Sequence, residues 1–283
     1  MLVGAHVSTA GGIDKAIDRA IEIEAEAMQI FASPPQGWAF KPVSDDSASL
    51  FREKAQASKF GPVFLHGVYL INLGTENLGN LQKGIDSLVN YMKSASSIGA
   101  TGVIFHPGSH KGRGYEGVLK QTVESIQQVL SAAPDNVWLI LENMAGMGNH
   151  IGAKFQELGG IIESVGDPRL KVCLDTQHCF AAGYEITTKV GIQNAMEEFD
   201  KEIGLSKLVV VHANDSKTPF ASGVDRHENI GQGYMGLEGF ETIIHHKAFR
   251  DLPFLLEVPG IEKKGPDREN VEILKSLRGN GNT

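Results

Sequence analysis

Residues 207–231 read KLVVVHANDSKTPFASGVDRHENIG, and they contain a strand pattern that recurs along the chain. An apolar run, Leu208 to Val211, ends in His212, and a polar segment then leads to Asp225 and His227. A strand that places its last side chain in a pocket has this pattern: buried apolar residues first, then a side chain that can bind a metal. Asp225 and His227 are two residues apart, so an extended loop would point both to one side. Taken alone, the stretch leaves metal binding and ordinary packing open.

The same pattern recurs along the chain, in alternation with amphipathic helical segments. Strands are predicted at residues 2–7, 28–32, 62–65, 102–105, 137–141, 170–174, 208–211 and 253–256. Helices are predicted near residues 13–21, 46–58, 81–95, 117–130, 153–165, 188–203 and 266–279, with another that contains His245 and His246. Such alternation predicts a parallel sheet, and eight units in 283 residues predict one (β/α)8 or TIM barrel domain, residues 1–283. A doubly wound open sheet is the alternative.

The composition limits the classes of protein that fit. A hydrophobic content of 41% with 21% charged residues is that of a soluble globular chain. No apolar run is long enough to span a membrane, and no secretory signal is visible. Two cysteines, Cys173 and Cys179, make no disulfide framework, so we expect reduced thiols in a cytoplasmic protein. The net charge of −8 argues against broad binding to nucleic acid but leaves room for a local positive site.

Six consecutive predicted strands end in a side chain that can bind a metal. In chain order these are His66, His106, Glu142, Asp175, His212 and Glu257. In a barrel all the strand ends meet on the C-terminal rim, where such enzymes carry their active sites. His178, Asp225 and His227 follow on the same rim. Nine donors are too many for one ion and suit two or three ions of zinc, or of manganese or iron.

Clustered divalent ions favour in-line displacement at phosphorus, so this rim predicts metal-assisted hydrolysis of a phosphodiester. Three dications against four carboxylates would leave a charge of about +2, which would attract an anionic substrate. A barrel sugar isomerase or epimerase is the main alternative, and it would need only one or two ions. A third possibility is a non-catalytic protein that binds damaged DNA and uses its metals only to stabilise the rim.

Eight long stretches make the sequence similar to the endonuclease IV family, which cleaves DNA at apurinic or apyrimidinic sites on a zinc-bearing TIM barrel. They are GAHVSTAGG (4–12), FLHGVYLINL (64–73), IFHPGSH (104–110), LILENMAG (139–146), KVCLDTQHCFAAGYE (171–185), HANDSK (212–217), SGVDRHENIGQG (222–233) and LLEVPG (255–260). All nine proposed ligands coincide with the metal-binding pattern of that family.

This resemblance implies a site with three zinc ions. The first ion would be held by His66, His106 and Glu142, the second by Glu142, Asp175, His212 and Glu257, and the third by His178, Asp225 and His227. The implied reaction is hydrolysis of the phosphodiester 5′ to an abasic site in duplex DNA, which leaves a 3′-hydroxyl and a 5′-deoxyribose phosphate. Glu142 and Glu257 would be the catalytic carboxylates, with Glu257 orienting the attacking oxygen. Removal of blocking groups from 3′ ends is also implied.

The resemblance extends less fully to contacts with DNA. Tyr69 and Leu70 match the residues that the family wedges into the bent duplex. Gln36 stands where some relatives carry an inserting arginine, so weaker or altered flipping of the nucleotide is expected. Lys217 and Arg226 are candidates for phosphate contacts. The expected partner is duplex DNA with abasic sites or blocked 3′ ends, bound by a monomer.

Overall fold

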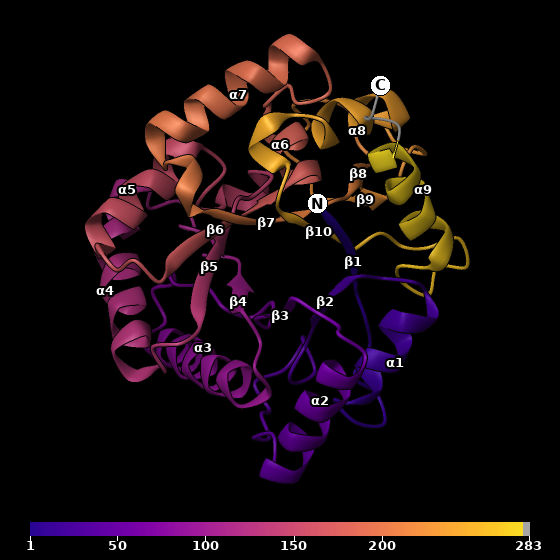
Figure 1. The fold of residues 1–283 in the computed structure, drawn as a ribbon. Helices are drawn as coiled ribbons and strands as arrows, with labels where there is room; N and C mark the ends of the chain where they lie inside the picture. The colour runs from indigo at the N-terminus through magenta and orange to yellow at the C-terminus, as the bar shows by residue number, and fades with distance from the viewer. Residues whose placement is uncertain (280–283) are drawn as a thin grey trace.

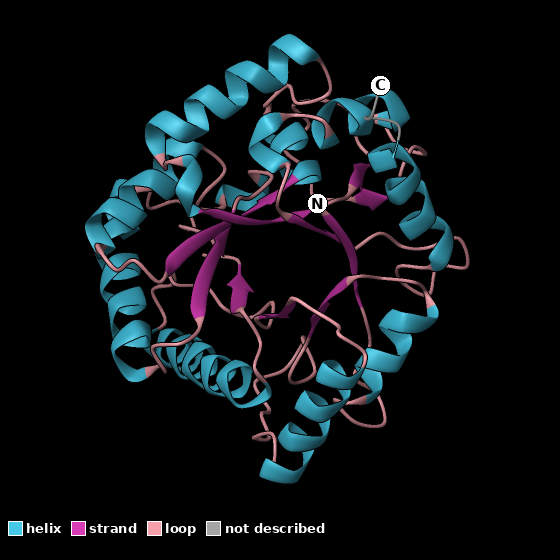
Figure 2. Ribbon diagram, viewed as in Figure 1, coloured by secondary structure: helices cyan, strands magenta, loops and turns pink. Residues whose placement is uncertain are grey.

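The computed structural model of the protein describes residues 1–279. Eight parallel strands close into a barrel, in the order β1-β10-β7-β6-β5-β4-β3-β2, and helices surround it (Figures 1 and 2). The strands are β1 (Leu2–His6), β2 (Ala27–Ile30), β3 (Val63–His66), β4 (Gly102–Phe105), β5 (Trp138–Glu142), β6 (Leu170–Asp175), β7 (Leu208–His212) and β10 (Pro253–Leu256). The predicted TIM barrel is therefore confirmed. None of the helices in residues 1–279 is long and apolar enough to cross a membrane.

The α-helices within residues 1–279 are α1 (Lys15–Glu22), α2 (Asp45–Ala57), α3 (Leu78–Ile98), α4 (Glu116–Ala132), α5 (Phe155–Val165), α6 (Thr176–Ala182), α7 (Lys189–Glu202), α8 (Gly236–Ile244) and α9 (Arg268–Gly279). Three of the longer helices begin at a polar cap, as expected for helix starts. The side chains of Ser44, Asn77 and Thr188 each accept a hydrogen bond from the backbone three residues on. The sequence did not predict the short helix α6. The predicted helix around His245 and His246 ends earlier, at Ile244.

The interior of the barrel explains why the strand ends converge. Seven strands contribute one residue each to a separate buried cluster: Ala27, Phe64, Ile104, Ile140, Cys173, Val210 and Leu255. The eighth strand contributes Gly4, where an added Cβ would lie 2.4 Å from the carbonyl oxygen of Ala27. Because strand side chains alternate, the residue two positions further along each strand also faces inward. These eight residues are His6, Gln29, His66, His106, Glu142, Asp175, His212 and Glu257.

A short antiparallel ribbon outside the barrel was not predicted. It pairs β8 (Asp215–Ser216) with β9 (His227–Glu228). The buried carboxylate of Asp215 holds the following loop by accepting backbone hydrogen bonds at 2.9–3.0 Å from Gly231, Gly233 and Met235. A Cβ on Gly233 would lie 2.4 Å from the carbonyl oxygen of Ser216, so only glycine fits there. This arrangement brings His227 to the barrel rim.

Candidate metal centre

Three groups of side chains at the C-terminal rim offer donor atoms close enough to share an ion. Within each group, one potential ligand atom per residue lies within 4.8 Å of the others. The groups are His66, His106 and Glu142; Glu142, Asp175, His212 and Glu257; and Asp175, His178 and His227. Glu142 and Asp175 each belong to two groups, so the three groups form one continuous cluster. Eight of the nine residues predicted from sequence are members of it.

Glu142 lies at the centre of this cluster and is fully buried. Its Oε2 atom is 3.1 Å from Nε2 of His106 and 3.3 Å from Nε2 of His66. Its Oε1 atom is 3.1 Å from Nδ1 of His212 and 3.3 Å from Nδ1 of His178. Burial opposes ionisation, but His212 and His106 outweigh it and hold the pKa of Glu142 well below its ordinary value. The two oxygens of one carboxylate thus face separate sets of imidazoles.

Two of the histidines are oriented by backbone carbonyl groups. Nδ1 of His66 lies 2.7 Å from the carbonyl oxygen of Gly67, and Nδ1 of His178 lies 2.8 Å from that of Asn143. Each Nδ1 must therefore carry the proton and donate it, which leaves Nε2 as the ring atom with a free lone pair. A hydrogen bond of this kind is the usual support of a histidine that binds a metal.

Asp225 is the predicted ligand that lies outside the three groups, although it faces two of their members. Its Oδ2 is 3.3 Å from Nε2 of His178, and its Oδ1 is 3.4 Å from Nε2 of His227. Burial raises the pKa of Asp225, but the neighbouring His178 and His227 outweigh it and lower the pKa below its ordinary value. The predicted trio of His178, Asp225 and His227 is therefore together, and Asp175 lies beside it with Oδ2 3.8 Å from Nε2 of His227.

The charges and the unpaired atoms of this cluster fit divalent cations. Glu142, Asp175, Asp225 and Glu257 bring four carboxylates together, and within residues 1–279 their ion-pair contacts are all with histidines. Burying such charge is costly unless positive charge compensates it. In the same part of the chain, Nε2 of His178 and Nε2 of His227 are buried without a hydrogen-bond partner. Imidazole and carboxylate donors in this mixture suit zinc-class ions.

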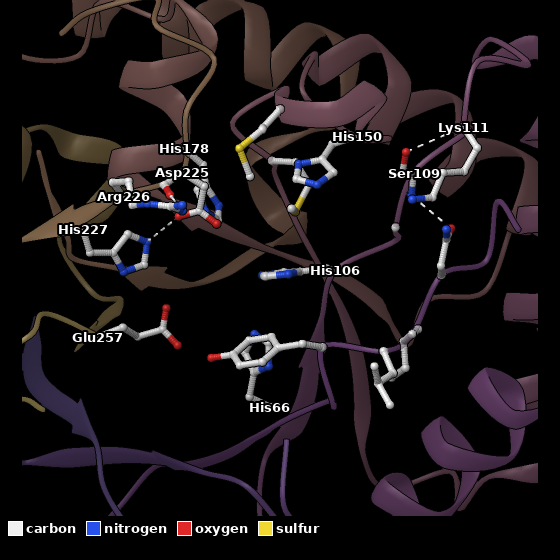
Figure 3. Close-up of a pocket in the computed structure, with 17 residues that line it drawn as sticks. His66, His106, Ser109, Lys111, His150, His178, Asp225, Arg226, His227 and Glu257 are labelled. Carbon is white, nitrogen blue, oxygen red and sulfur yellow. Dashed lines mark hydrogen bonds and ion pairs between the residues drawn. The ribbon is translucent and has the colours of Figure 1, made fainter. Parts of the chain in front are cut away.

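A cavity of about 730 Å³ opens over the cluster. In Figure 3, His66, His106, His178, His227 and Glu257 point into the same space. Tyr69 and Leu70 line the cavity and are 55% and 39% exposed, so they present apolar surface beside the donor atoms. The ring of Tyr69 packs edge-on against Phe31, with 5.4 Å between centroids. Burial, Glu257 and Glu142 raise the pKa of Tyr69 above its ordinary value, so its phenol stays neutral.

Of the three other predicted DNA contacts, one lines this cavity. Arg226 is exposed and lines it, and its guanidinium donates to the carbonyl oxygen of Asp225. Lys217 is exposed and lies 3.8 Å from the carboxylate of Glu228. Gln36 is exposed in the loop between β2 and α2. The structure brings Arg226 to the cavity with Tyr69 and Leu70.

Sequence reasoning missed the residues that hold the candidate ligands in place. The side chain of Asn214 donates to Oδ2 of Asp175 at 2.7 Å, and its oxygen accepts from the backbone of Glu257. The oxygen of Asn143 accepts from the backbone of Asp175 at 2.7 Å. Gln29 is buried in β2 and contacts two further cluster residues. These residues share one feature in the sequence by which they could have been identified: each is a polar residue inside an apolar strand or close after its end.

The comparisons with known proteins agree with this geometry. Residues 17–277 match the family described as xylose isomerase-like TIM barrel. The probable endonuclease 4 of Halothermothrix orenii is 41% identical over 97% of this chain and 99% of its own length. The crystal structure of endonuclease IV from Thermus thermophilus has a TM-score of 0.88 at 32% identity, covering 99% of this chain and 100% of that one.

The fold, the rim cluster and these relatives together therefore define a TIM-barrel hydrolase of the xylose isomerase-like class. Within that class, the chain belongs to the endonuclease IV family. A D-tagatose 3-epimerase-like protein also matches, with a TM-score of 0.76 at 19% identity over 100% of this chain and 98% of its own. At that identity the likeness concerns the barrel alone.

Proposed function

We propose that this chain is a DNA-repair endonuclease that hydrolyses the phosphodiester 5′ to an abasic site in duplex DNA. The products would be a 3′-hydroxyl and a 5′-deoxyribose phosphate, and trimming of blocked 3′ ends would be a second activity of the same site. Membership of the endonuclease IV family supports the substrate class. The observation that carries the proposal is the continuous donor cluster, in which Glu142 and Asp175 are each shared by two groups.

We assign three zinc ions to this cluster, with manganese or iron as possible substitutes. The first would be held by His66, His106 and Glu142, the second by Glu142, Asp175, His212 and Glu257, and the third by His178, Asp225 and His227. The distances of Asp225 to His178 and His227 support the third set, and Asp175 is close enough to contribute to it. When bound, such ions supply Lewis-acid charge and lower the pKa of water.

The carboxylates of the chain have distinct proposed roles at this centre. Glu142 is fully buried, so its role is to fix the relative positions of the imidazoles on both sides of it. Glu257 lines the cavity and its side chain is 14% exposed, so it can contact a water molecule next to the substrate. Burial raises the pKa of Glu257, but His212 and His6 outweigh this and lower it, so Glu257 is ionised and can accept a hydrogen bond that orients that water.

The cavity and its rim support recognition of a displaced nucleotide. A volume of about 730 Å³ accommodates a sugar phosphate that has left the base stack. Tyr69 and Leu70 would enter the space left in the duplex, because both are exposed beside the cavity. Arg226 and Lys217 would contact phosphates, and Gln36 would meet the DNA from the loop after β2. All nine proposed ligands come from one chain, which supports a monomer as the active unit, with residues 1–283 as a single domain.

Incision of a duplex with one synthetic abasic site tests the proposal, with the metal content of the same preparation measured. We expect cleavage on the 5′ side, with about three zinc-class ions per chain. Intact DNA in the presence of all the ions would contradict the proposed reaction. Because the barrel resembles that of a D-tagatose 3-epimerase-like protein, ketose epimerisation should be assayed on the same preparation. Turnover of a sugar with one or two ions bound would favour the isomerase or epimerase alternative.

A further inference from the structure

A buried glutamine on β2 connects three residues at the barrel rim. Gln29 has no exposed surface, and its Nε2 lies 2.6 Å from Oε1 of Glu257 and 2.9 Å from Nδ1 of His6. Its Oε1 lies 2.8 Å from Nε2 of His212. The strand register supports these contacts, because β1 and β2 pair His6 directly with Gln29. A glutamine in an otherwise apolar buried strand needs such partners.

The hydrogen bonds of Gln29 fix which nitrogen of His212 carries a proton. An ionised Glu257 can only accept, so the amide NH₂ of Gln29 must face it and the amide oxygen must face His212. Nε2 of His212 therefore carries a proton and donates it to Gln29. Nδ1 of His212 then points at the carboxylates, 3.1 Å from Oε1 of Glu142 and 3.3 Å from Oε2 of Glu257.

We propose that Gln29 is a positioning residue for the second ion, which it serves by orienting His212 and Glu257 together. The inference rests on the metal site proposed above. One amide contributes to both ligands: it leaves Nδ1 of His212 free to bind, and it holds Oε1 of Glu257, which leaves Oε2 as the oxygen that would bind the ion. His66 and His178 are supported by backbone carbonyls instead, which substitution does not remove. Gln29 is thus a support that mutation can test separately.

The first test is Gln29→Met, which keeps the length of the side chain and removes both amide groups. Loss of such an outer support lowers metal affinity about 10- to 100-fold. We expect a rise of that size in the dissociation constant of one zinc ion, measured by competition with a chelator, while the other ions stay bound. Thr122→Val is the matched control, since it also replaces a fully buried polar group, on the outer helix α4. Thermal unfolding of the metal-free proteins checks that both variants fold.

A second measurement uses the unmodified protein and does not depend on how the variant folds. In the zinc-loaded chain, correlation of the ring ¹⁵N and ¹H signals should show His212 protonated at Nε2, with slow exchange of that proton. A proton at Nδ1 of His212 would overturn the inference, as would equal zinc affinity in Gln29→Met and the wild type. Neither readout involves DNA, so a failure to cleave abasic DNA would refute the proposed function and leave this inference standing. A wild-type chain that binds no ion would overturn both.

Discussion

The Nδ1 atom of His212 lies 3.1 Å from Oε1 of Glu142, at the point where two of the donor groups meet. The two residues end strands β7 and β5, which are separated in the barrel by β6. Their contact therefore depends on the curvature of the closed sheet, which turns inward-facing side chains of non-adjacent strands toward each other. A substitution of Glu142 should therefore affect both of the donor groups to which it belongs.

Glu142→Gln should disturb two ions at once while preserving the packing of the barrel. The amide keeps the shape of the carboxylate but removes the negative charge that His106 and His212 face. We expect the metal content to fall by one to two ions per chain and cleavage to fall by at least about 10²–10³-fold, the scale for a preorganised electrostatic group. Glu124→Gln on the exposed side of α4 is the control. Wild-type metal content in Glu142→Gln would refute the shared-ligand role.

Asp225→Asn tests the third proposed ion separately. Asp225 faces His178 and His227, whereas Glu142 faces His178 together with the imidazoles of the other two groups. We expect one ion to be lost and kcat to fall by about 10²-fold. Binding of abasic DNA, measured by fluorescence anisotropy, should change much less. If Asp225→Asn cleaves at a near-normal rate, Asp175, His178 and His227 would suffice for the ion and the role of Asp225 would have to be dropped.

Tyr69→Ala should weaken DNA binding with little effect on folding. The side chain is 55% exposed and lines the cavity, so the substitution mainly removes a surface on which a base or sugar can stack. Such stacking contributes about 1–3 kcal/mol, which predicts a rise in Kd of about 5- to 150-fold. Tyr69→Phe should retain most of the affinity. Trp138→Ala is the control and should leave Kd unchanged, because Trp138 begins β5, at the end of the strand away from the rim. Equal Kd values for all three variants would exclude a wedge role for Tyr69.

The barrel could be predicted from sequence because its two repeating signals are local. Each strand is a short apolar run, and the polar residue at its end lies on the rim. His66 and Glu142 are examples. Pairing of adjacent parallel strands then brings those residues together without further information. The candidate ligands were predictable for the same reason, since six of them directly end a strand.

The remaining features depend on contacts between segments far apart in the chain. Gln29 looks like an ordinary interruption of an apolar run until β1, β2 and β10 are placed side by side. The ribbon that carries His227 depends on Asp215, which accepts hydrogen bonds from a loop about 20 residues further along. The position of Asp175 between two donor groups likewise follows from the closure of the sheet and has no local signal.

Removal of the ions should lower stability as well as activity. Without cations the buried carboxylates of Glu142 and Asp175 lose the charge of the ions, and within residues 1–279 their ion-pair contacts are with histidines, which must then take up protons to replace that charge. An ion present at 1,000 times its Kd stabilises the folded state by about 4 kcal/mol. We expect a chelator to lower Tm by several degrees and added zinc to restore it. An unchanged Tm would mean that the cluster folds without cations.

Glu26 provides a test of pH-dependent stability at the opposite end of the barrel. Its carboxylate accepts hydrogen bonds from the backbone of Val3 at 2.8 Å and from Arg278 of α9 at 2.7 Å, and so joins β1 to the last helix. Burial raises the pKa of Glu26, but Arg278 and Val3 outweigh it and lower the pKa below the ordinary value of 4.5. A carboxyl group whose pKa is lower in the folded state stabilises that state above its unfolded pKa and loses the effect as pH falls.

Glu26→Gln should therefore cost about 0.5–1 kcal/mol of unfolding free energy at pH 7, a value limited by the partial exposure of the pair. The difference from the wild type should shrink as the pH is lowered below 4.5, because protonation of Glu26 removes from the wild type the charge that the variant already lacks. Urea unfolding of the metal-free proteins between pH 7 and pH 3 measures this without interference from the rim. A difference that stays constant over this range would show that Glu26 acts through its shape and not its charge.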